Sequence, residues 1–346
     1  MATAQQFKAF LADIEPSTTT KGLSSSAQKS LRDYLRQHPE FKDVHLFTFL
    51  TGSYLRDSAI RPRLVNGKLQ KPDIDIIVVT NHTEKDKPAS VHQLLEDVLA
   101  EEYELCDDPH TRSVGIKTSA VEMDVVAIIA PAQYWQAPYS EGMNLEDLIK
   151  YRLFLPDKAL AQWCETNPPK QIKWSNEVNK ASGGMFKPLV KLVKWWRRET
   201  PTVDKRPKGF VLECMVAECM DLRETSHELA FIKVLDGIVQ HYAIPFTLGQ
   251  VPYICDPGVP TNSVTSAMTF DQFAPFYKKV KAYAELAHQA HDETEPEKQL
   301  KLWRQIFGDR FPAPGVAAKS LEAAFAPGGL TFPDKPITPR KPTGFA

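Results

Sequence analysis

Two aspartates one residue apart stand at the start of a short apolar segment, and a third stands in a second apolar segment. Asp73 and Asp75 lead into Ile-Ile-Val-Val, and Asp124 lies in the run 121–129. Residues two apart on a strand face the same side, so Asp73 and Asp75 would project together, away from a core. Carboxylates rarely enter hydrophobic strands unless they are paired or bind a metal. If the two strands are neighbours, three carboxylates converge on one spot.

Three carboxylates this close would repel one another unless cations lie between them. Mg²⁺ takes oxygen ligands and usually completes its shell with substrate phosphates. We therefore predict Asp73, Asp75 and Asp124 as catalytic residues and as the ligands of two Mg²⁺ ions in a phosphoryl-transfer site. The alternative, surface carboxylates at strand ends, requires two separate apolar strands each to carry one by accident. Glu122 shares the face of Asp124, but such a residue is more often a solvated strand neighbour and stays outside the predicted set.

A Gly-Ser pair follows the apolar run 45–50 and precedes the first two aspartates. A strand that ends in Gly52-Ser53 and turns into a helix would present backbone N–H groups in a geometry that favours phosphate. Gly52 would let the backbone approach closely, and the Ser53 hydroxyl would add a hydrogen bond. Gly-Ser alone occurs in many ordinary turns. Followed by Asp-Ile-Asp and later by Glu-Met-Asp, it predicts a phosphate-binding turn.

The order of these motifs resembles the nucleotidyltransferase superfamily of polymerase-β type. The fuller string 52–62, Gly-Ser-Tyr-Leu-Arg-Asp-Ser-Ala-Ile-Arg-Pro, is similar to the bacterial cGAS/DncV-like branch, which includes the cyclic GMP–AMP synthases of antiphage signalling. Segment 186–196 resembles the helix that packs behind the active site of these enzymes. The similarity covers roughly residues 25–310. Leu55 and Asp57 depart from the family, which usually carries Ala and a small residue there.

The resemblance implies further substrate-binding residues. It suggests that Lys191 or Lys194 reaches the triphosphate across a cleft, although both also fit a solvated cationic stripe on one helix face. Asp256, in a segment similar to one of the oligoadenylate synthases, would lie near the nucleotide base. An aspartate before proline in a loop is also a common turn cap. Trp195-Trp196 predicts at least one core ring, and Arg197-Arg198 is expected to face solvent.

The resemblance also implies the fold and the reaction. The fold would be α/β (α+β) with two lobes, a mixed-sheet catalytic lobe and a helical lobe, and the active site would lie between them. The reaction would be Mg²⁺-dependent joining of ATP, with GTP, into a cyclic dinucleotide of the cyclic GMP–AMP type for antiphage signalling. Two alternatives stay open: another nucleotidyl transfer (linear oligoadenylate synthesis, RNA tailing, or modification of a small molecule or protein), and a non-catalytic nucleotide sensor on the same fold.

Composition limits the class of protein. The chain has 346 residues, 42% of them hydrophobic, and its 42 Lys and Arg balance 43 Asp and Glu. Balanced charge argues against strong nonspecific nucleic-acid binding, so nucleic acid is not a required partner. No apolar stretch approaches the roughly 20 residues of a membrane span, and the start carries no signal-peptide pattern. Five scattered cysteines without C-x-x-C indicate neither a disulfide framework nor a zinc site, so we expect a cytoplasmic protein.

We predict three parts along the chain: a catalytic lobe with an N-terminal helix at 1–150, a helical lobe at 151–310, and a Pro-rich arm or tail at 311–346. The Gly-Phe-Ala end resembles relatives whose C-terminus a ubiquitin-ligase-like partner conjugates, with disorder as the alternative. A downstream effector would bind the product rather than the enzyme. Periodicity predicts strands at 45–50, 112–118 and 121–129, and helices at 27–38, 89–103, 158–166, 175–184, 187–199, 209–221, 227–242, 270–291 and 296–307.

Overall fold

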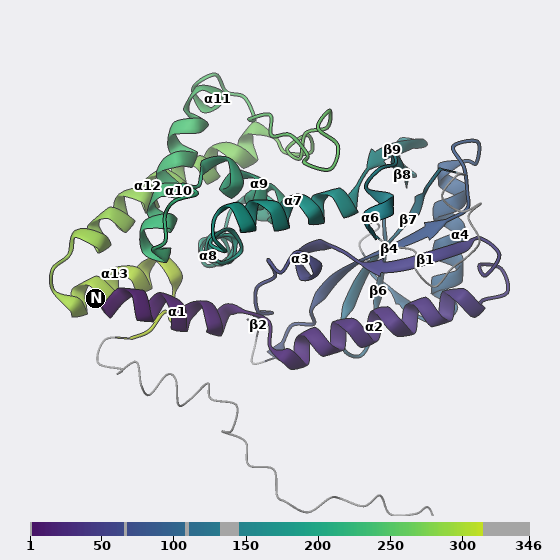
Figure 1. The fold of residues 1–346 in the computed structure, drawn as a ribbon, viewed down its shortest axis with the longest axis horizontal. Coiled ribbons are helices and arrows are strands. Elements are labelled where there is room, and N and C mark those ends of the chain that lie inside the picture. The colour runs from purple at the N-terminus through teal and green to yellow at the C-terminus, as the bar shows by residue number, and fades with distance from the viewer. Residues whose placement is uncertain (1, 66–67, 108–110, 132–144, 314–346) are drawn as a thin grey trace, which may run out of the picture.

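The computed structural model describes residues 2–65, 68–107, 111–131 and 145–313. These residues form two lobes, a sheet lobe and a helical lobe (Figure 1), as the sequence predicts. The predicted tail at 311–346, with its proposed conjugation site, lies almost entirely outside the described residues. None of the described helices has the length and apolar character needed to cross a membrane.

The sheet lobe contains a seven-stranded mixed sheet. Its main path runs through β1 (His45–Leu50), β4 (Asp73–Thr80), β7 (Glu122–Ile129), β6 (Val114–Lys117) and β5 (Glu104–Leu105), and β7 also pairs with the hairpin of β8 (Leu153–Asp157) and β9 (Gln162–Thr166). β4 and β7 are parallel neighbours, and the other pairs are antiparallel. A separate hairpin, β2 (Leu64–Val65) with β3 (Lys68–Leu69), precedes β4.

Alternation along β4 separates the core from the cavity. Ile74, Ile76 and Val78 are fully buried and pack against the two helices on one face of the sheet, α2 (Thr18–Gln37) and α4 (Pro88–Ala100). The intervening residues face the other side, where Ile77 and Val79 belong to a second, smaller core cluster. Asp73 and Asp75 therefore lie on the face away from α2 and α4, as their spacing predicts.

The helical lobe is built around one large apolar core. Its helices are α1 (Ala2–Ile14), α7 (Pro168–Ala181), α8 (Phe186–Glu199), α9 (Gly209–Cys219), α10 (His227–His241), α11 (Ala243–Thr247), α12 (Phe270–Asp292) and α13 (Pro296–Phe307). Short helical segments elsewhere are α3 (Gly52–Leu55), α6 (Leu145–Leu148) and η1 (Val203–Lys205). Both Trp195 and Trp196 are buried, so the prediction of a core tryptophan is confirmed.

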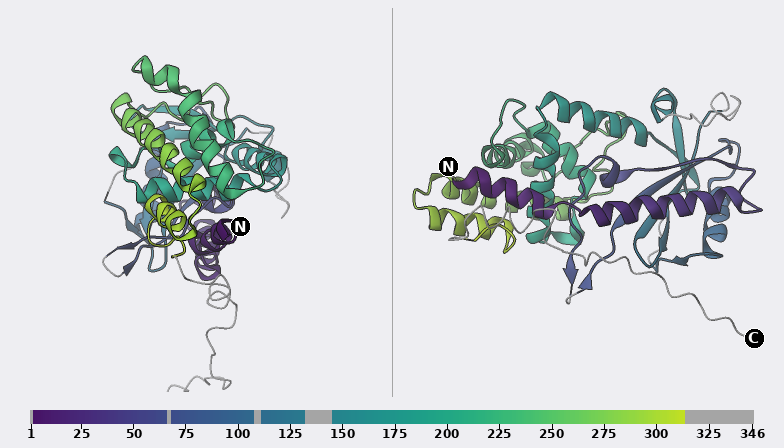
Figure 2. Two further views of the ribbon diagram at one scale, coloured as in Figure 1. Left: turned by 90° about the vertical axis from the view of Figure 1, so that its left-hand side faces the viewer. Right: turned by 60° about the horizontal axis from the view of Figure 1, so that its bottom comes forward.

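Two sequence predictions need correction. The predicted helix 158–166 is wrong, because this segment holds the turn and second strand of the β8–β9 hairpin, where backbone pairing overrides the helical spacing of the apolar residues. The sheet therefore continues past residue 150. The predicted helix 27–38 corresponds to the second half of α2 and packs on the sheet, but the first helix, α1, packs through Phe7 and Phe10 into the helical core although its residues fall inside the predicted catalytic lobe. α1 and α2 run along one side of the molecule, with α1 on the helical lobe and α2 on the sheet (Figure 2).

Candidate active site

The Gly-Ser turn joins the sheet directly to α3. Thr51 N–H donates a hydrogen bond of 2.8 Å to the carbonyl of Asp75, and the chain then turns at Gly52 with φ +66°. A Cβ at position 52 would lie 1.7 Å from Oδ2 of Asp75, so only glycine fits between the turn and this carboxylate. The helix that follows, α3, is a single turn of four residues. The backbone of the turn therefore lies directly against the Asp75 carboxylate of β4.

The predicted aspartates lie on paired strands. In the parallel β4–β7 pair, Asp75 is opposite Asp124 and Asp73 is opposite Glu122. Asp73, Asp75 and Asp124 line one cavity of about 700 Å³ together with Gly52 and Ser53. Burial and then the Asp124 carboxylate raise the pKa of Asp75 above its ordinary value, against the opposing effect of nearby cations. The structure therefore brings the five residues predicted from the two motifs to one place.

The donor chemistry of this cavity suits a hard cation. Carboxylates from two adjacent strands line the same cavity, and the Asp75 carboxylate lies directly against the backbone of Gly52. Among the described residues, no three acidic, cysteine or histidine side chains already form a metal-binding group. Mg²⁺ does not require one, since it commonly binds through one or two carboxylates plus water and substrate phosphates. Asp75 and Asp124 are the pair best placed to hold it, with Asp73 at the exposed start of β4.

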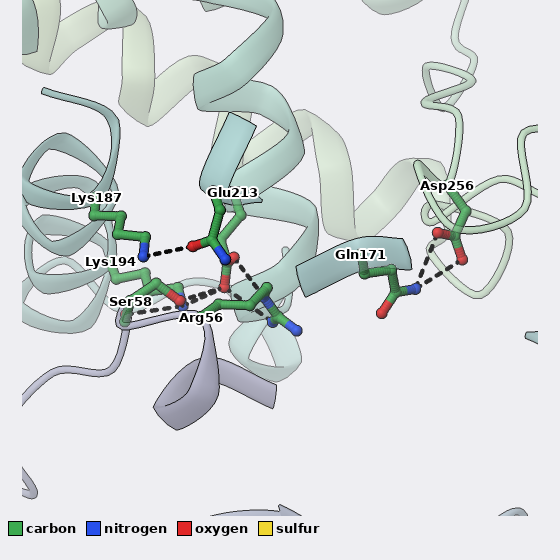
Figure 3. Close-up of polar contacts among 8 residues, drawn as sticks. Arg56, Ser58, Gln171, Lys187, Lys194, Glu213 and Asp256 are labelled. Carbon is green, nitrogen blue, oxygen red and sulfur yellow. Dashed lines mark hydrogen bonds and ion pairs between the residues drawn. The ribbon is translucent and has the colours of Figure 1, made fainter. Parts of the chain in front are cut away.

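A buried ionic cluster ties the turn to the helical lobe (Figure 3). Glu213 of α9 is fully buried and accepts hydrogen bonds from Lys194 Nζ at 2.7 Å, from Arg56 Nε at 2.8 Å and from Ser58 Oγ at 2.8 Å. Burial alone would raise the pKa of Glu213, but Lys194 and Arg56 outweigh it and lower this pKa to about 2. Glu213 is thus a permanent anion that fixes two cations in the cavity wall.

Two residues implied by the resemblance lie elsewhere. Lys191 does not line the cavity, because its buried ammonium pairs with Glu15 at 2.7 Å and with Asp57 at 3.4 Å. Asp57, one of the departures from the family pattern, therefore supplies a counter-ion for Lys191. Asp256 also lies behind the cavity wall, where it accepts hydrogen bonds from Gln171, itself a lining residue (Figure 3). Lys194 alone of the three reaches the cavity.

Asp256 has the local role of a turn cap. Its carboxylate accepts the backbone N–H of Gly258 at 2.7 Å, and its own N–H donates to the carbonyl of Asn262. The same carboxylate takes both hydrogen bonds from the Gln171 amide, at 3.0 and 3.1 Å. Asp256 can therefore influence a bound nucleotide through Gln171 rather than by its own contact.

The sequence interpretation missed most of the cationic side chains that line the cavity. Arg197 and Arg198 do not face solvent as expected but are half-buried in the lining of the cavity. Arg56 lies inside the very string that carried the family resemblance. Glu213 interrupts the apolar run of α9, the same signal that singled out the aspartates of the strands. Burial of an ionised group in an apolar helix could thus have marked Glu213 as part of a site.

Comparisons with known proteins agree with this geometry. A family model described as "Second Messenger Oligonucleotide or Dinucleotide Synthetase domain" matches residues 1–179. The cyclic AMP-AMP-AMP synthase of an Acinetobacter species is 44% identical over 358 residues, covering 100% of this chain and 98% of the relative. This chain belongs to that family.

A second relative and a solved structure extend the similarity. The cyclic AMP-AMP-GMP synthase of Enterobacter hormaechei is 31% identical over 386 residues, covering 99% of both chains. The fold resembles Escherichia coli CdnC, solved with ATP, with a TM-score of 0.65 at 17% identity, covering 89% of this chain and 98% of that one. The protein is a bacterial cGAS/DncV-like nucleotidyltransferase that synthesises a cyclic oligonucleotide. These relatives do not favour the linear-product, RNA-tailing or sensor alternatives.

Proposed function

We propose that this nucleotidyltransferase joins three adenylate units from ATP into a cyclic trinucleotide, with Asp73, Asp75 and Asp124 as its catalytic and Mg²⁺-binding residues. The observation that carries the site is the register of Asp75 opposite Asp124, beside a turn that only glycine can form. The product follows the full-length relative that is named for cyclic AMP-AMP-AMP. GTP is a second candidate substrate, because another relative is named for a product that contains GMP.

Each group of cavity residues has a separate role in the proposed reaction. The Ser53 hydroxyl and the backbone at Gly52 bind the triphosphate of the donor nucleotide. Arg56, at the end of the same short helix, and Lys194, on the helical lobe, add positive charge to the cavity lining. Two bound Mg²⁺ ions, held by the three aspartates, would neutralise charge on the reacting phosphate and lower the pKa of the acceptor hydroxyl. The cleft aligns the acceptor for in-line attack, which converts a bimolecular reaction into a nearly unimolecular one.

The reaction is a sequence of identical transfers. A ribose hydroxyl of the acceptor attacks the α-phosphorus of the donor, its proton passes to the Asp124 carboxylate, and the bond to the bridging oxygen of the β-phosphate breaks. Pyrophosphate leaves with that oxygen. Two such transfers give a linear trinucleotide that keeps one 5′-triphosphate. A third transfer, from the terminal hydroxyl onto that triphosphate, closes the ring, so three ATP yield one ring and three pyrophosphates.

Product analysis tests the proposal. Purified protein is incubated with Mg²⁺ and with ATP labelled at the α-phosphate, with or without GTP. The product is then treated with phosphatase, and its mass is determined by mass spectrometry. We expect a phosphatase-resistant cyclic triadenylate that disappears in Asp75→Asn and Asp124→Asn. Glu122→Gln is the matched control, because Glu122 lies on the same strand as Asp124 but does not line the cavity. A cyclic dinucleotide, or a product that survives both aspartate variants, would refute the proposal.

We further propose that the cyclic product is a signal in defence against phage and that an effector recognises the product rather than the enzyme. The support is the similarity of segment 52–62 to the bacterial synthases of antiphage signalling. Cells that carry the gene with its genomic neighbours should resist phage infection in a plaque assay. Resistance that persists with Asp75→Asn would show that the defence does not depend on nucleotidyl transfer.

A further inference from the structure

One end of the cavity is lined by three arginines from two parts of the chain. Arg197 and Arg198 belong to the last turn of α8, and Arg63 belongs to the segment between α3 and β2. All three line the same cavity as the catalytic aspartates. We call these three residues the arginine wall.

The positive charge of the arginine wall is poorly compensated, unlike that of three other cationic side chains that line the cavity. Arg56 and Lys194 share Glu213, and Arg61 pairs with Asp13 at 2.6 Å. In the described part of the chain, neither Arg63 nor Arg197 has a carboxylate within 4 Å, and Arg198 has only Glu199, at 3.9 Å. The positive charge of the arginine wall is therefore largely uncompensated. Lys71 and Lys208 also line the cavity and, in the described part of the chain, have no carboxylate within 4 Å.

The arginines are held in place by groups that carry no charge. The Arg198 guanidinium lies 3.8 Å from the centre of the Trp195 ring and donates to the carbonyl of Arg61 at 2.5 Å. Arg63 donates to the carbonyl of Arg198 at 2.9 Å, and Arg197 donates to the carbonyl of Lys205 at 3.0 Å. These contacts orient the guanidinium groups without neutralising them, an arrangement that prepares planar donors for an anion.

Two of the guanidinium groups also have an N–H group without a hydrogen-bond partner in the described part of the chain. Nε of Arg197 and Nε of Arg198 are buried without a hydrogen-bond partner among the described residues. Burial lowers the pKa of Arg197, with a further contribution from Arg63. The pKa of Arg198 falls to about 10 through burial and repulsion by Arg63, Arg310 and Arg197, although Glu199 opposes the shift. A polyanion at the wall would relieve this repulsion.

We propose that the arginine wall binds the 5′-triphosphate of the acceptor strand, at a subsite separate from the donor triphosphate at Gly52 and Ser53. This inference depends on the proposed function. While the strand grows, its own 5′-triphosphate must stay away from the catalytic aspartates until ring closure, when it becomes the donor. Arg198 lies four residues after Lys194 on α8, about 6 Å along the axis, so the helix offers adjacent cationic positions to two triphosphates.

The test compares two acceptors that differ only at the 5′ end. A linear adenylate dinucleotide, in the linkage found in the product, is supplied with a 5′-triphosphate or with a 5′-hydroxyl, and labelled ATP is the donor. The measured quantity is the ratio of kcat/KM for the two acceptors. We expect the wild type to prefer the triphosphate. The double variant Arg197→Gln/Arg198→Gln should lower the ratio by about tenfold or more, as lost charge-assisted hydrogen bonds require.

Three controls make the result specific. Arg63→Gln should lower the same ratio, and Arg223→Gln, an exposed arginine outside the cavity, should leave it unchanged. The rate with the 5′-hydroxyl acceptor reports folding, since it should stay within about twofold of wild type. A fall with both acceptors would indicate a structural role and overturn the inference, and so would an unchanged ratio in the double variant.

Two further outcomes are distinguishable. If the wall binds free polyphosphate instead, inorganic triphosphate will inhibit the wild type but not the double variant while the acceptor ratio stays the same, and the assignment is wrong. If the wild type transfers adenylate to neither acceptor and makes no ring from ATP, the proposed function itself fails. Ring synthesis with a ratio near one in the wild type would leave the proposed function intact and refute the subsite alone.

Discussion

The Cβ of any residue other than glycine at position 52 would lie 1.7 Å from Oδ2 of Asp75. The same glycine has φ +66°, in the left-handed region that residues with a Cβ rarely adopt. Two independent constraints therefore act on one position, and both arise because the turn after β1 lies against Asp75 of β4. The proposed phosphate-binding turn and the proposed catalytic carboxylate are therefore built as one unit.

Gly52→Ala should therefore abolish product formation, because the new methyl group must displace the Asp75 carboxylate. We also expect a loss of about 1–2 kcal/mol in the free energy of unfolding from the strained backbone. Labelled-ATP turnover and urea denaturation measure the two effects. Gly22→Ala is the matched control: Gly22 lies at an exposed position of α2 with open space around it, so this change should be neutral or slightly stabilising. Full activity in Gly52→Ala would contradict the close approach.

The strand pattern was predictable because its cause is local. Alternation of Asp73, Ile74, Asp75 and Ile76 fixes which face each side chain takes, whatever the partner strand is. The β8–β9 hairpin was not predictable in the same way, since residues 158–166 carry helical spacing and only pairing with 153–157 decides their structure. Local periodicity therefore located the acids but misassigned the segment whose conformation depends on a partner.

The ionic cluster around Glu213 could not be predicted from the sequence for a related reason. Arg56 and Glu213 are 157 residues apart, so no spacing rule connects them, although each stands out in its own segment. The same applies to Lys191 and Glu15, 176 residues apart. The sequence of a helix face with several lysines does not indicate whether a given lysine contacts substrate or pairs with a carboxylate. Only the tertiary fold separates Lys194, in the cavity, from Lys191, outside it.

Removal of the charge of Glu213 should destabilise the protein strongly. Glu213→Gln leaves Lys194 and Arg56 buried without their anion, and breaking a buried ion pair in this way typically costs about 3–5 kcal/mol. Urea denaturation gives the change in unfolding free energy. Glu177→Gln on exposed α7 removes the partner of Lys173 at 3.8 Å and should change stability by less than about 1 kcal/mol. Equal stabilities for the two variants would show that the buried cluster carries no net stabilisation.

The same cluster predicts a dependence of stability on pH. The pKa of Glu213 is about 2 in the folded protein, below its ordinary value of 4.5, so the folded state favours the ionised carboxylate. Its contribution is fully present above pH 4.5 and is lost as the pH falls from 4.5 toward 2, because the unfolded chain binds the proton first. The shift corresponds to about 3 kcal/mol.

Comparison of wild type with Glu213→Gln isolates this contribution from that of other carboxylates. The difference in unfolding free energy between the two proteins should be constant from pH 7 to about pH 5 and should shrink below it. A difference that stays the same down to pH 3 would mean that Glu213 does not change its affinity for protons on folding.

Lys191 provides the sharpest contrast between the family resemblance and the structure. The resemblance allows Lys191 to contact the triphosphate, whereas its ammonium is 2.7 Å from Glu15 and 3.4 Å from Asp57 and does not line the cavity. Lys191→Met should therefore lower the unfolding free energy by about 1–3 kcal/mol while the KM for ATP stays within about threefold of wild type. Thermal or urea unfolding and initial-rate kinetics measure the two quantities.

A double-mutant cycle with Asp57→Asn decides whether the ion pair is responsible. If Lys191 acts through Asp57, the double variant should be more stable than the sum of the single losses predicts, since the second change removes a partner that is already lost. Lys194→Met serves as the contrasting variant, because Lys194 lines the cavity and should raise the KM for ATP when it is lost. A rise in KM for Lys191→Met as large as that for Lys194→Met would place Lys191 at the substrate, against the geometry.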